Sequence, residues 1–175
     1  RWTQDPKKLA IIRLNRHQNK MEVLLANAKV GTIVPLYREE NKYYIDESNL
    51  DNLVFLDNGT QFVITSEKSG YMHLYLYDLN GRERQAITKG NFDIIDFYGY
   101  DPVRKLFYYS SYEESPLEKY IYSINEKGLK KKLTPVKGWN EASFSKNFNY
   151  YINVVSNTDT PPVTALYNAK GKQVR

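Results

Sequence analysis

The chain has 175 residues, no cysteine, 16 tyrosines and a formal net charge of +5 at pH 7. This length suffices for one domain with a hydrophobic core, and the lack of cysteine excludes a disulfide framework and a thiolate metal site. No apolar run approaches the roughly 18 residues of a membrane-spanning helix, so we expect no membrane span in this segment.

One phrase recurs four times along the chain: an aromatic residue, a tight polar turn and a run of strand-forming residues. The four copies start at Trp2, Phe55, Tyr100 and Phe144. Their turn positions, which are 53, 43 and 46 residues apart in succession, are Asp5, Asn58, Asp101 and Asn147. A period in the forties that is built from short strands is typical of propeller blades.

Each copy continues in the same order. A second strand is predicted at 23–26, 74–77, 121–124 and 163–167. A glycine turn follows each of these strands, at Gly31, Gly81, Gly128 and Gly171. In the first three copies a closing strand comes next, at 32–36, 84–88 and 130–134. The last two units are expected to open with strands at 94–98 and 141–145. Short turns are expected at 49–53 and 115–118.

The sequence therefore predicts an all-β fold, a partial β-propeller of about three to four four-stranded antiparallel blades. Its repeats are roughly 1–45, 46–93, 94–138 and 139–175. The first copy lacks a strand before Trp2, and the last copy stops where its closing strand should begin. Because blades are stabilised by closing into a ring, we expect residues 1–175 to be an excised segment of one larger propeller domain.

The many tyrosines and the lysines suit such sheets. Large flat rings fill the space between stacked sheets, which accounts for the tyrosine content. The run Lys130-Lys131-Lys132 is interpreted as a solvated edge strand, where lysines discourage pairing with another edge. A nucleic-acid surface would need a basic face with free stacking aromatics, so we expect no nucleic-acid partner.

Several segments resemble dipeptidyl peptidase IV-like enzymes of the prolyl oligopeptidase superfamily, in a bacterial, Bacteroidetes-like form. They include TSEKSGYMHLYLY at 65–77 and the segments at 13–19, 87–92, 115–123 and 142–151. The resemblance covers essentially the whole chain. It implies the later blades of an N-terminal eight-bladed propeller that caps a C-terminal α/β-hydrolase domain in the same protein. We expect that hydrolase domain to be absent from residues 1–175.

The resemblance further implies a serine peptidase as the parent. The hydrolase domain of that family carries a Ser, Asp, His triad and removes Xaa-Pro or Xaa-Ala dipeptides from peptide N-termini. The propeller limits access and helps to hold the peptide substrate. The resemblance also implies a periplasmic, secreted or membrane-associated parent that forms homodimers in some members.

No catalytic residues are expected in this chain. A serine hydrolase of that fold needs a Gly-x-Ser-x-Gly elbow, which the sequence lacks. Ser66 and Ser69 lie in a strand-to-turn segment without an elbow. His17 and His73 are interpreted as surface or packing residues, and nothing pairs them into a zinc site. We therefore expect neither a metal nor a cofactor.

The loop at 42–53 is the candidate substrate loop, because it is the longest insert that does not repeat and propeller loops carry function. In the family the matching segment supplies an aromatic-Arg pair near the substrate, a pair that this chain lacks. Its place is taken by the candidate residues Tyr44, Asp46 and Glu47. The alternative is that Tyr43 and Tyr44 only plug the blade.

The adjacent carboxylates Glu39 and Glu40 are chemically able to grip one ammonium group. The corresponding pair of the family lies on an earlier insertion, so Glu39 and Glu40 are interpreted as parts of a solvated polar loop. The motif at Asn58 matches a glycosylation sequon, but an Asn-Gly hairpin turn is the preferred interpretation.

Two other functions remain open. The first is a free-standing propeller that binds a protein or glycan partner, without a hydrolase. The second is a propeller glycosidase, which needs two inward carboxylates. The acidic residues are predicted to lie in turns rather than on the inner strands, which argues against a glycosidase.

Overall fold

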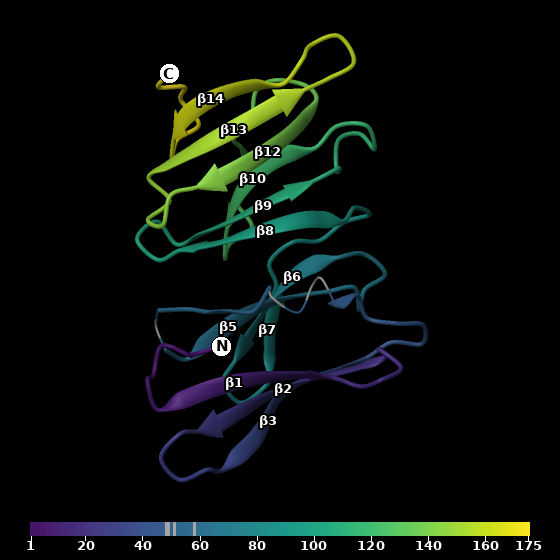
Figure 1. The fold of residues 1–175 in the computed structure, drawn as a ribbon, viewed down its shortest axis with the longest axis vertical. Coiled ribbons are helices and arrows are strands. Elements are labelled where there is room, and N and C mark those ends of the chain that lie inside the picture. The colour runs from purple at the N-terminus through teal and green to yellow at the C-terminus, as the bar shows by residue number, and fades with distance from the viewer. Residues whose placement is uncertain (48–49, 51, 58) are drawn as a thin grey trace. The chain divides into compact units, whose positions relative to one another are not determined.

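The computed structural model describes residues 1–47, 50, 52–57 and 59–175 (Figure 1). Within this part of the chain the strands form four antiparallel sheets, which confirms the predicted all-β class. The chain divides into two compact units, residues 1–86 and 87–175. The expected turn at 49–53 lies partly, and Asn58 wholly, outside the described residues.

Sheet A, in the first unit, has the order β1 (Lys8–Leu14), β2 (Lys20–Asn27) and β3 (Ile33–Glu40). Among the described residues that precede β1, Trp2 forms an isolated antiparallel bridge with Leu9 of β1. In β2 the buried positions are Met21, Val23 and Leu25, so one face of sheet A is apolar.

Sheet B has the order β4 (Val54–Phe55), β5 (Gln61–Ser66), β6 (His73–Asp78) and β7 (Glu83–Ala86). Its central strands β5 and β6 are buried on both faces. Aromatic rings fill the space between sheets A and B, where Tyr77 stacks on Phe62 at 5.4 Å and meets Tyr37 edge-on at 5.0 Å. Such contacts stabilise the core beyond the burial of apolar area.

The second unit contains sheets C and D. Sheet C consists of β8 (Ile94–Asp101), β9 (Leu106–Ser111), β10 (Tyr120–Asn125) and β11 (Lys130–Lys132). Sheet D consists of β12 (Trp139–Phe144), β13 (Tyr150–Ser156) and β14 (Val163–Asn168). The core between them again contains stacked rings, with Tyr108 on Phe148 at 4.9 Å and Tyr151 on Tyr167 at 5.2 Å.

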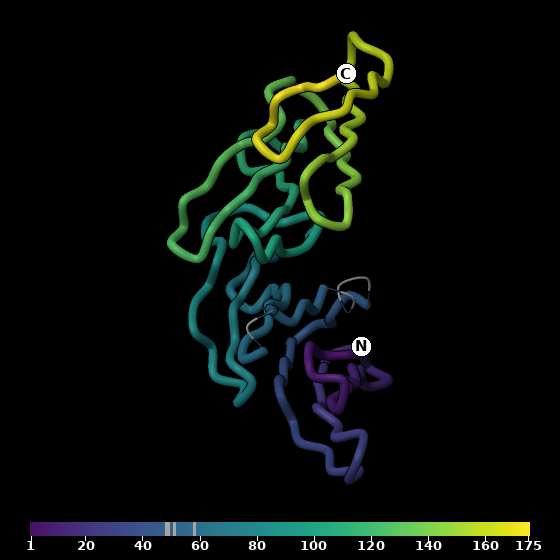
Figure 2. The backbone as a smooth tube through the Cα atoms, turned by 90° about the vertical axis from the view of Figure 1, so that its left-hand side faces the viewer, coloured from purple at the N-terminus to yellow at the C-terminus, as the bar shows by residue number. Residues whose placement is uncertain are grey.

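Sheets B and C have the predicted four strands, and sheets A and D have three. β11 is an edge strand of sheet C, and Lys130 and Lys131 are exposed on it, as the sequence predicts. Buried tyrosine rings fill the two cores, as the sequence predicts, whereas Tyr43, Tyr44, Tyr71 and Tyr150 are exposed. Figure 2 traces the succession of hairpins along the backbone from the purple N-terminal strands to the yellow C-terminal ones.

A turn of the same kind follows one strand of each sheet, β2, β6, β10 and β14, and it is one residue longer after β2. Its first residue is Asn27, Asp78, Asn125 or Asn168, whose side-chain oxygen accepts hydrogen bonds from the backbone of the turn. Its glycine, Gly31, Gly81, Gly128 or Gly171, has a φ between 71° and 79°. Because this left-handed conformation is costly for residues with a Cβ, the repeated glycine determines the turn.

Sheets B and C carry the same cross-strand cluster with the charges exchanged. In sheet B, Lys68 lies 4.0 Å from the centre of the Tyr75 ring and pairs with Glu83 on β7. In sheet C the acid follows the second strand, and Lys132 on β11 pairs with Glu114 at 2.7 Å and lies 3.5 Å from the Tyr120 ring. Each cluster ties an outer strand to its neighbours.

Candidate functional site

The candidate substrate loop leaves sheet A after β3 and is tied back to the turn between β1 and β2. The backbone N–H of Asn41 donates to the carbonyl oxygen of Asn19 at 2.9 Å, and that of Ile45 donates to Gln18 at 2.5 Å. Ile45 is buried in the core of the first unit. The loop is therefore anchored through its backbone and one apolar side chain.

The tyrosines of this loop do not plug the blade. Tyr43 is 77% exposed and Tyr44 is 56% exposed, so that alternative is wrong. Ile45 fills the core instead, because its backbone tether directs its side chain inward. Asp46 and Glu47 are also exposed. Tyr44, Asp46 and Glu47 are thus accessible together on one short segment, and their contact with a substrate stays a prediction.

Glu39 and Glu40 lie in a strand, which corrects the predicted polar loop. β3 continues through Glu40, and successive strand residues face opposite sides of the sheet. Glu39 is buried and accepts a 2.5 Å hydrogen bond from the Tyr37 hydroxyl, whereas Glu40 is exposed and pairs with Lys20 at 3.0 Å. The two carboxylates therefore cannot grip one ammonium group.

The Tyr37 hydroxyl is a neutral donor to Glu39. Burial, together with the negative charge of the Glu39 carboxylate, raises the pKa of Tyr37 far above its ordinary value. The hydrogen bond ties Glu39 to its own strand at the loop end of the sheet. It also satisfies a carboxylate that would otherwise be costly to bury.

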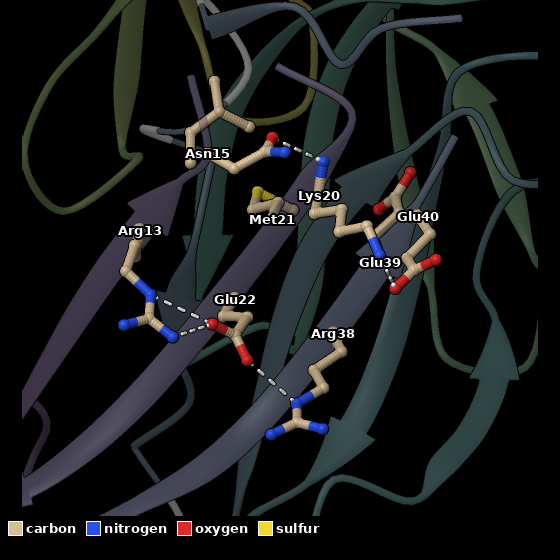
Figure 3. Close-up of a pocket in the computed structure, with 9 residues that line it drawn as sticks. Arg13, Asn15, Lys20, Met21, Glu22, Arg38, Glu39 and Glu40 are labelled. Carbon is tan, nitrogen blue, oxygen red and sulfur yellow. Dashed lines mark hydrogen bonds and ion pairs between the residues drawn. The ribbon is translucent and has the colours of Figure 1, made fainter. Parts of the chain in front are cut away.

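A groove of about 320 Å³ runs over sheet A at this end (Figure 3). Figure 3 shows Glu22 between the guanidinium groups of Arg13 and Arg38, and both arginines pair with it. The hydrogen bond from Arg13, with the charge of Arg38, holds the pKa of Glu22 below its ordinary value. Glu22 and Glu40 are thus already paired with neighbouring cations, whereas Glu39 accepts the hydrogen bond from Tyr37.

A second, much smaller cavity of about 10 Å³ lies under the candidate loop. Its lining includes Glu39, Asn41, Asp46, Ser66 and Glu67. Glu39 of β3 and Met21 of β2 line both this cavity and the groove, so the two adjoin at these side chains. The volume suits a single water-sized group rather than a peptide.

Ser66 and His73 are opposite each other in the β5–β6 ladder, but both are buried. A nucleophile must be open to its substrate, so this pair does not form a hydrolytic centre. His17 is exposed and His73 is buried, which fits their interpretation as a surface and a packing residue. Within the described residues, no three His, Asp or Glu side chains gather into a group that could hold a metal ion.

Some carboxylates lie within the first strands of their sheets, which corrects the prediction that the acids fall in turns. Asp96 is in β8 and Glu141 is in β12. Both contact the ammonium of buried Lys119, with Nζ–O distances of 3.1 Å and 3.7 Å. Burial alone would raise the pKa of Asp96, but the hydrogen bond from Ser110 and the charge of Lys119 outweigh it and lower that pKa. Both carboxylates already contact one ammonium group of the chain itself, so the pair does not fit the chemistry of a glycosidase, whose two acids flank a sugar.

A family profile for the dipeptidyl peptidase IV (DPP IV) N-terminal region matches residues 1–162. The chain belongs to this family. Among curated members, the dipeptidyl peptidase 4 of Trichophyton rubrum is 30% identical over 132 residues, which are 69% of this chain and 17% of that protein. The dipeptidyl peptidase 4 of Arthroderma otae is 29% identical over 174 residues, which are 91% of this chain and 21% of that protein.

Solved structures of bacterial DPP IV proteins have the same fold. The crystal structure of Porphyromonas gingivalis dipeptidyl peptidase 4 matches 99% of this chain with a TM-score of 0.93 and 37% identity. A Bacteroides ovatus structure described as a dipeptidyl aminopeptidase IV matches 99% with a TM-score of 0.83 and 25% identity. The four sheets are therefore partial propeller blades of the DPP IV type. The chain spans about a quarter of each matched structure, 25% and 27%.

One further feature concerns membranes. Among the residues that the structure describes, none forms a helix with the length and apolar character that a membrane crossing requires.

Proposed function

We propose that this chain is the non-catalytic propeller segment of a serine-type dipeptidyl peptidase. The observation that carries the proposal is the match of 99% of the chain to the Porphyromonas gingivalis dipeptidyl peptidase 4 structure. The burial of Ser66 and His73 supports a non-catalytic role. The parent enzyme would remove Xaa-Pro or Xaa-Ala dipeptides from peptide N-termini, using an α/β-hydrolase domain of the same protein.

In this proposal the propeller gates access to the hydrolase and helps to hold the peptide. The repeats at 1–45, 46–93, 94–138 and 139–175 are parts of one larger propeller. Tyr44, Asp46 and Glu47 are the candidate contacts, because their exposed carboxylates and ring suit the ammonium group and apolar side chains of a peptide. From the resemblance to the family we further propose that the parent lies in the periplasm, outside the cell or at a membrane surface, and that it forms a homodimer.

The candidate contacts are tested in the full-length enzyme that contains this chain. Replacing Tyr44→Ala, Asp46→Asn and Glu47→Gln one at a time should raise KM for a Gly-Pro chromogenic substrate, with kcat nearly unchanged. Loss of one charge-assisted hydrogen bond corresponds to about a tenfold rise. Lys127→Ala, in an exposed turn of the second unit, is the control. Unchanged KM in all three variants would remove the loop from substrate binding.

The non-catalytic role has a separate test. The purified chain of residues 1–175 should release no chromogenic group from the same substrate. Turnover by this chain that a serine-directed inhibitor abolishes would overturn the proposal. Reading the gene past the codon for Arg175 separates it from a free-standing propeller, because a peptidase must encode an elbow serine.

A further inference from the structure

The ammonium group of Lys119 is enclosed by two carboxylates and an aromatic ring of the second unit. Lys119 precedes β10 and is only 4% exposed. Its Nζ lies 3.1 Å from Asp96 Oδ2, 3.7 Å from Glu141 Oε1 and 4.9 Å from the centre of the Trp139 ring. Carboxylates and the face of an indole are the groups that stabilise a buried cation in proteins.

Each wall of this enclosure is held by groups other than Lys119. Asp96 accepts hydrogen bonds from the hydroxyls of Ser110 at 2.7 Å and Tyr98 at 3.3 Å. Glu141 Oε1 accepts the indole N–H of Trp139 at 3.1 Å. The Tyr112 ring packs against Trp139 at 5.7 Å. The enclosure is therefore organised in advance for a cation, which lowers the cost of binding one.

The enclosure joins two sheets. Asp96 belongs to sheet C, whereas Trp139 and Glu141 belong to sheet D. At the same point the backbone N–H of Lys119 donates to Gly138 at 3.1 Å, and that of Asn140 donates to Lys119 at 3.1 Å. The ammonium thus lies at the junction where β12 first meets sheet C.

We propose that Asp96, Glu141 and Trp139 form a preorganised site for a primary ammonium group, which Lys119 occupies as an internal ligand to hold sheet D against sheet C. The proposal goes beyond the peptidase function and does not depend on it. Three hydrogen-bond donors on a compact charge fit this site, whereas an uncharged group of equal length would leave both carboxylates without their counter-ion.

Chemical rescue tests the proposal. Lys119→Ala removes three methylene groups and the ammonium, which together correspond to n-propylammonium. This variant should have a lower Tm than the unmodified chain, and added n-propylammonium should raise its Tm by about 2–4 °C, since a ligand that binds only the folded state stabilises it. 1-Propanol has the same length without the charge and should give no such rise. Tetramethylammonium, a cation without N–H donors, should also fail.

Two controls separate rescue at this site from a general effect of amines. Lys127→Ala removes an exposed lysine and should not respond to n-propylammonium. Adding Asp96→Asn to Lys119→Ala should abolish the response, because it removes the closest carboxylate. Equal responses to n-propylammonium and 1-propanol, or an equal response in Lys127→Ala, would overturn the proposal. If Lys119→Ala does not fold alone, refolding yield with n-propylammonium is the measure, and failure to recover the fold would count against it.

Discussion

A Cβ atom placed on Gly81 would lie 2.4 Å from the carbonyl oxygen of Leu36. The turn between β6 and β7 thus packs directly against the backbone of β3. The equivalent glycine of sheet C, Gly128, has nearly the same φ, 79° against 76°, but a Cβ there would meet nothing within 4 Å. The two turns share one conformation and differ in their surroundings.

This difference predicts unequal costs for the same substitution. Gly128→Ala should destabilise the chain by about 1 kcal/mol, the cost of a left-handed conformation for a residue with a Cβ. Gly81→Ala should cost clearly more, because the methyl group must also displace the Leu36 carbonyl. Urea denaturation of both variants checks this. Equal losses of stability in the two variants would contradict the close contact between the Gly81 turn and the Leu36 carbonyl.

Lys105 offers a gain of stability. It is exposed in the turn between β8 and β9 with a φ of 56°, a conformation that glycine adopts without strain. Lys105→Gly should stabilise the chain by about 0.5 kcal/mol. The substitution relieves the backbone strain of the folded chain, and this gain exceeds the cost of the larger conformational entropy that glycine gives the unfolded chain. Lys127→Gly is the matched control, because Lys127 is exposed and has no positive φ. It should lower stability in the same denaturation experiment.

Because the lysine and the acid exchange places between sheets B and C, we expect that swapping the charges of Lys132 and Glu114 restores part of the stability that a single charge reversal removes. Lys132→Glu places a third acid beside Glu113 and Glu114 and should destabilise the chain. Adding Glu114→Lys should recover part of the loss, with a coupling of about 0.2–1 kcal/mol because both side chains are partly exposed. A double-mutant cycle measures the coupling, and it should shrink in 1 M salt. A coupling of zero would show that the pair contributes nothing.

Stability should fall in acid partly through Asp96. The pKa of Asp96 is lower in the folded chain than in the unfolded chain. The ionised side chain therefore stabilises the fold fully above the unfolded pKa of about 3.9, and this stabilisation is lost as the pH falls through the pKa of the folded state. Asp96→Asn should therefore be less stable than the unmodified chain at pH 6, and the difference should diminish below about pH 4. Denaturation at pH 6 and pH 3 tests this. A difference that stays constant would contradict the assigned pKa direction.

The parts of the fold that depend on local signals could be predicted from the sequence. The four Asn or Asp residues and the four glycines of the outer turns act within a few residues, and strand alternation is equally local. β3 was cut short in the prediction because Arg38, Glu39 and Glu40 are poor strand formers. Cross-strand pairs with Glu22 and Lys20 compensate for this, and they become visible only once the strands are aligned.

The candidate site was predicted only in part. The accessible segment with Tyr44, Asp46 and Glu47 could be found because it interrupts the repeat. The inward side chain of Ile45 could not, because it depends on a hydrogen bond to Gln18, far along the chain. Lys119 could not be found from the sequence, because β10, the strand that it precedes, is buried on both faces and shows no alternation that would mark it. Its carboxylate partners come from other strands and leave no local pattern.

The opposite placement of the charges in the cross-strand clusters of sheets B and C affects which strands pair with each other during folding. Because the hairpins of the sheets resemble one another, an outer strand can pair with the hairpin of another sheet during folding. In sheet B, β11 would bring Lys132 toward Lys68, and in sheet C, β7 would bring Glu83 toward Glu113 and Glu114. Repulsion between like charges opposes both exchanges. The polarity of each cluster thus favours the pairing of β7 and of β11 with its own hairpin.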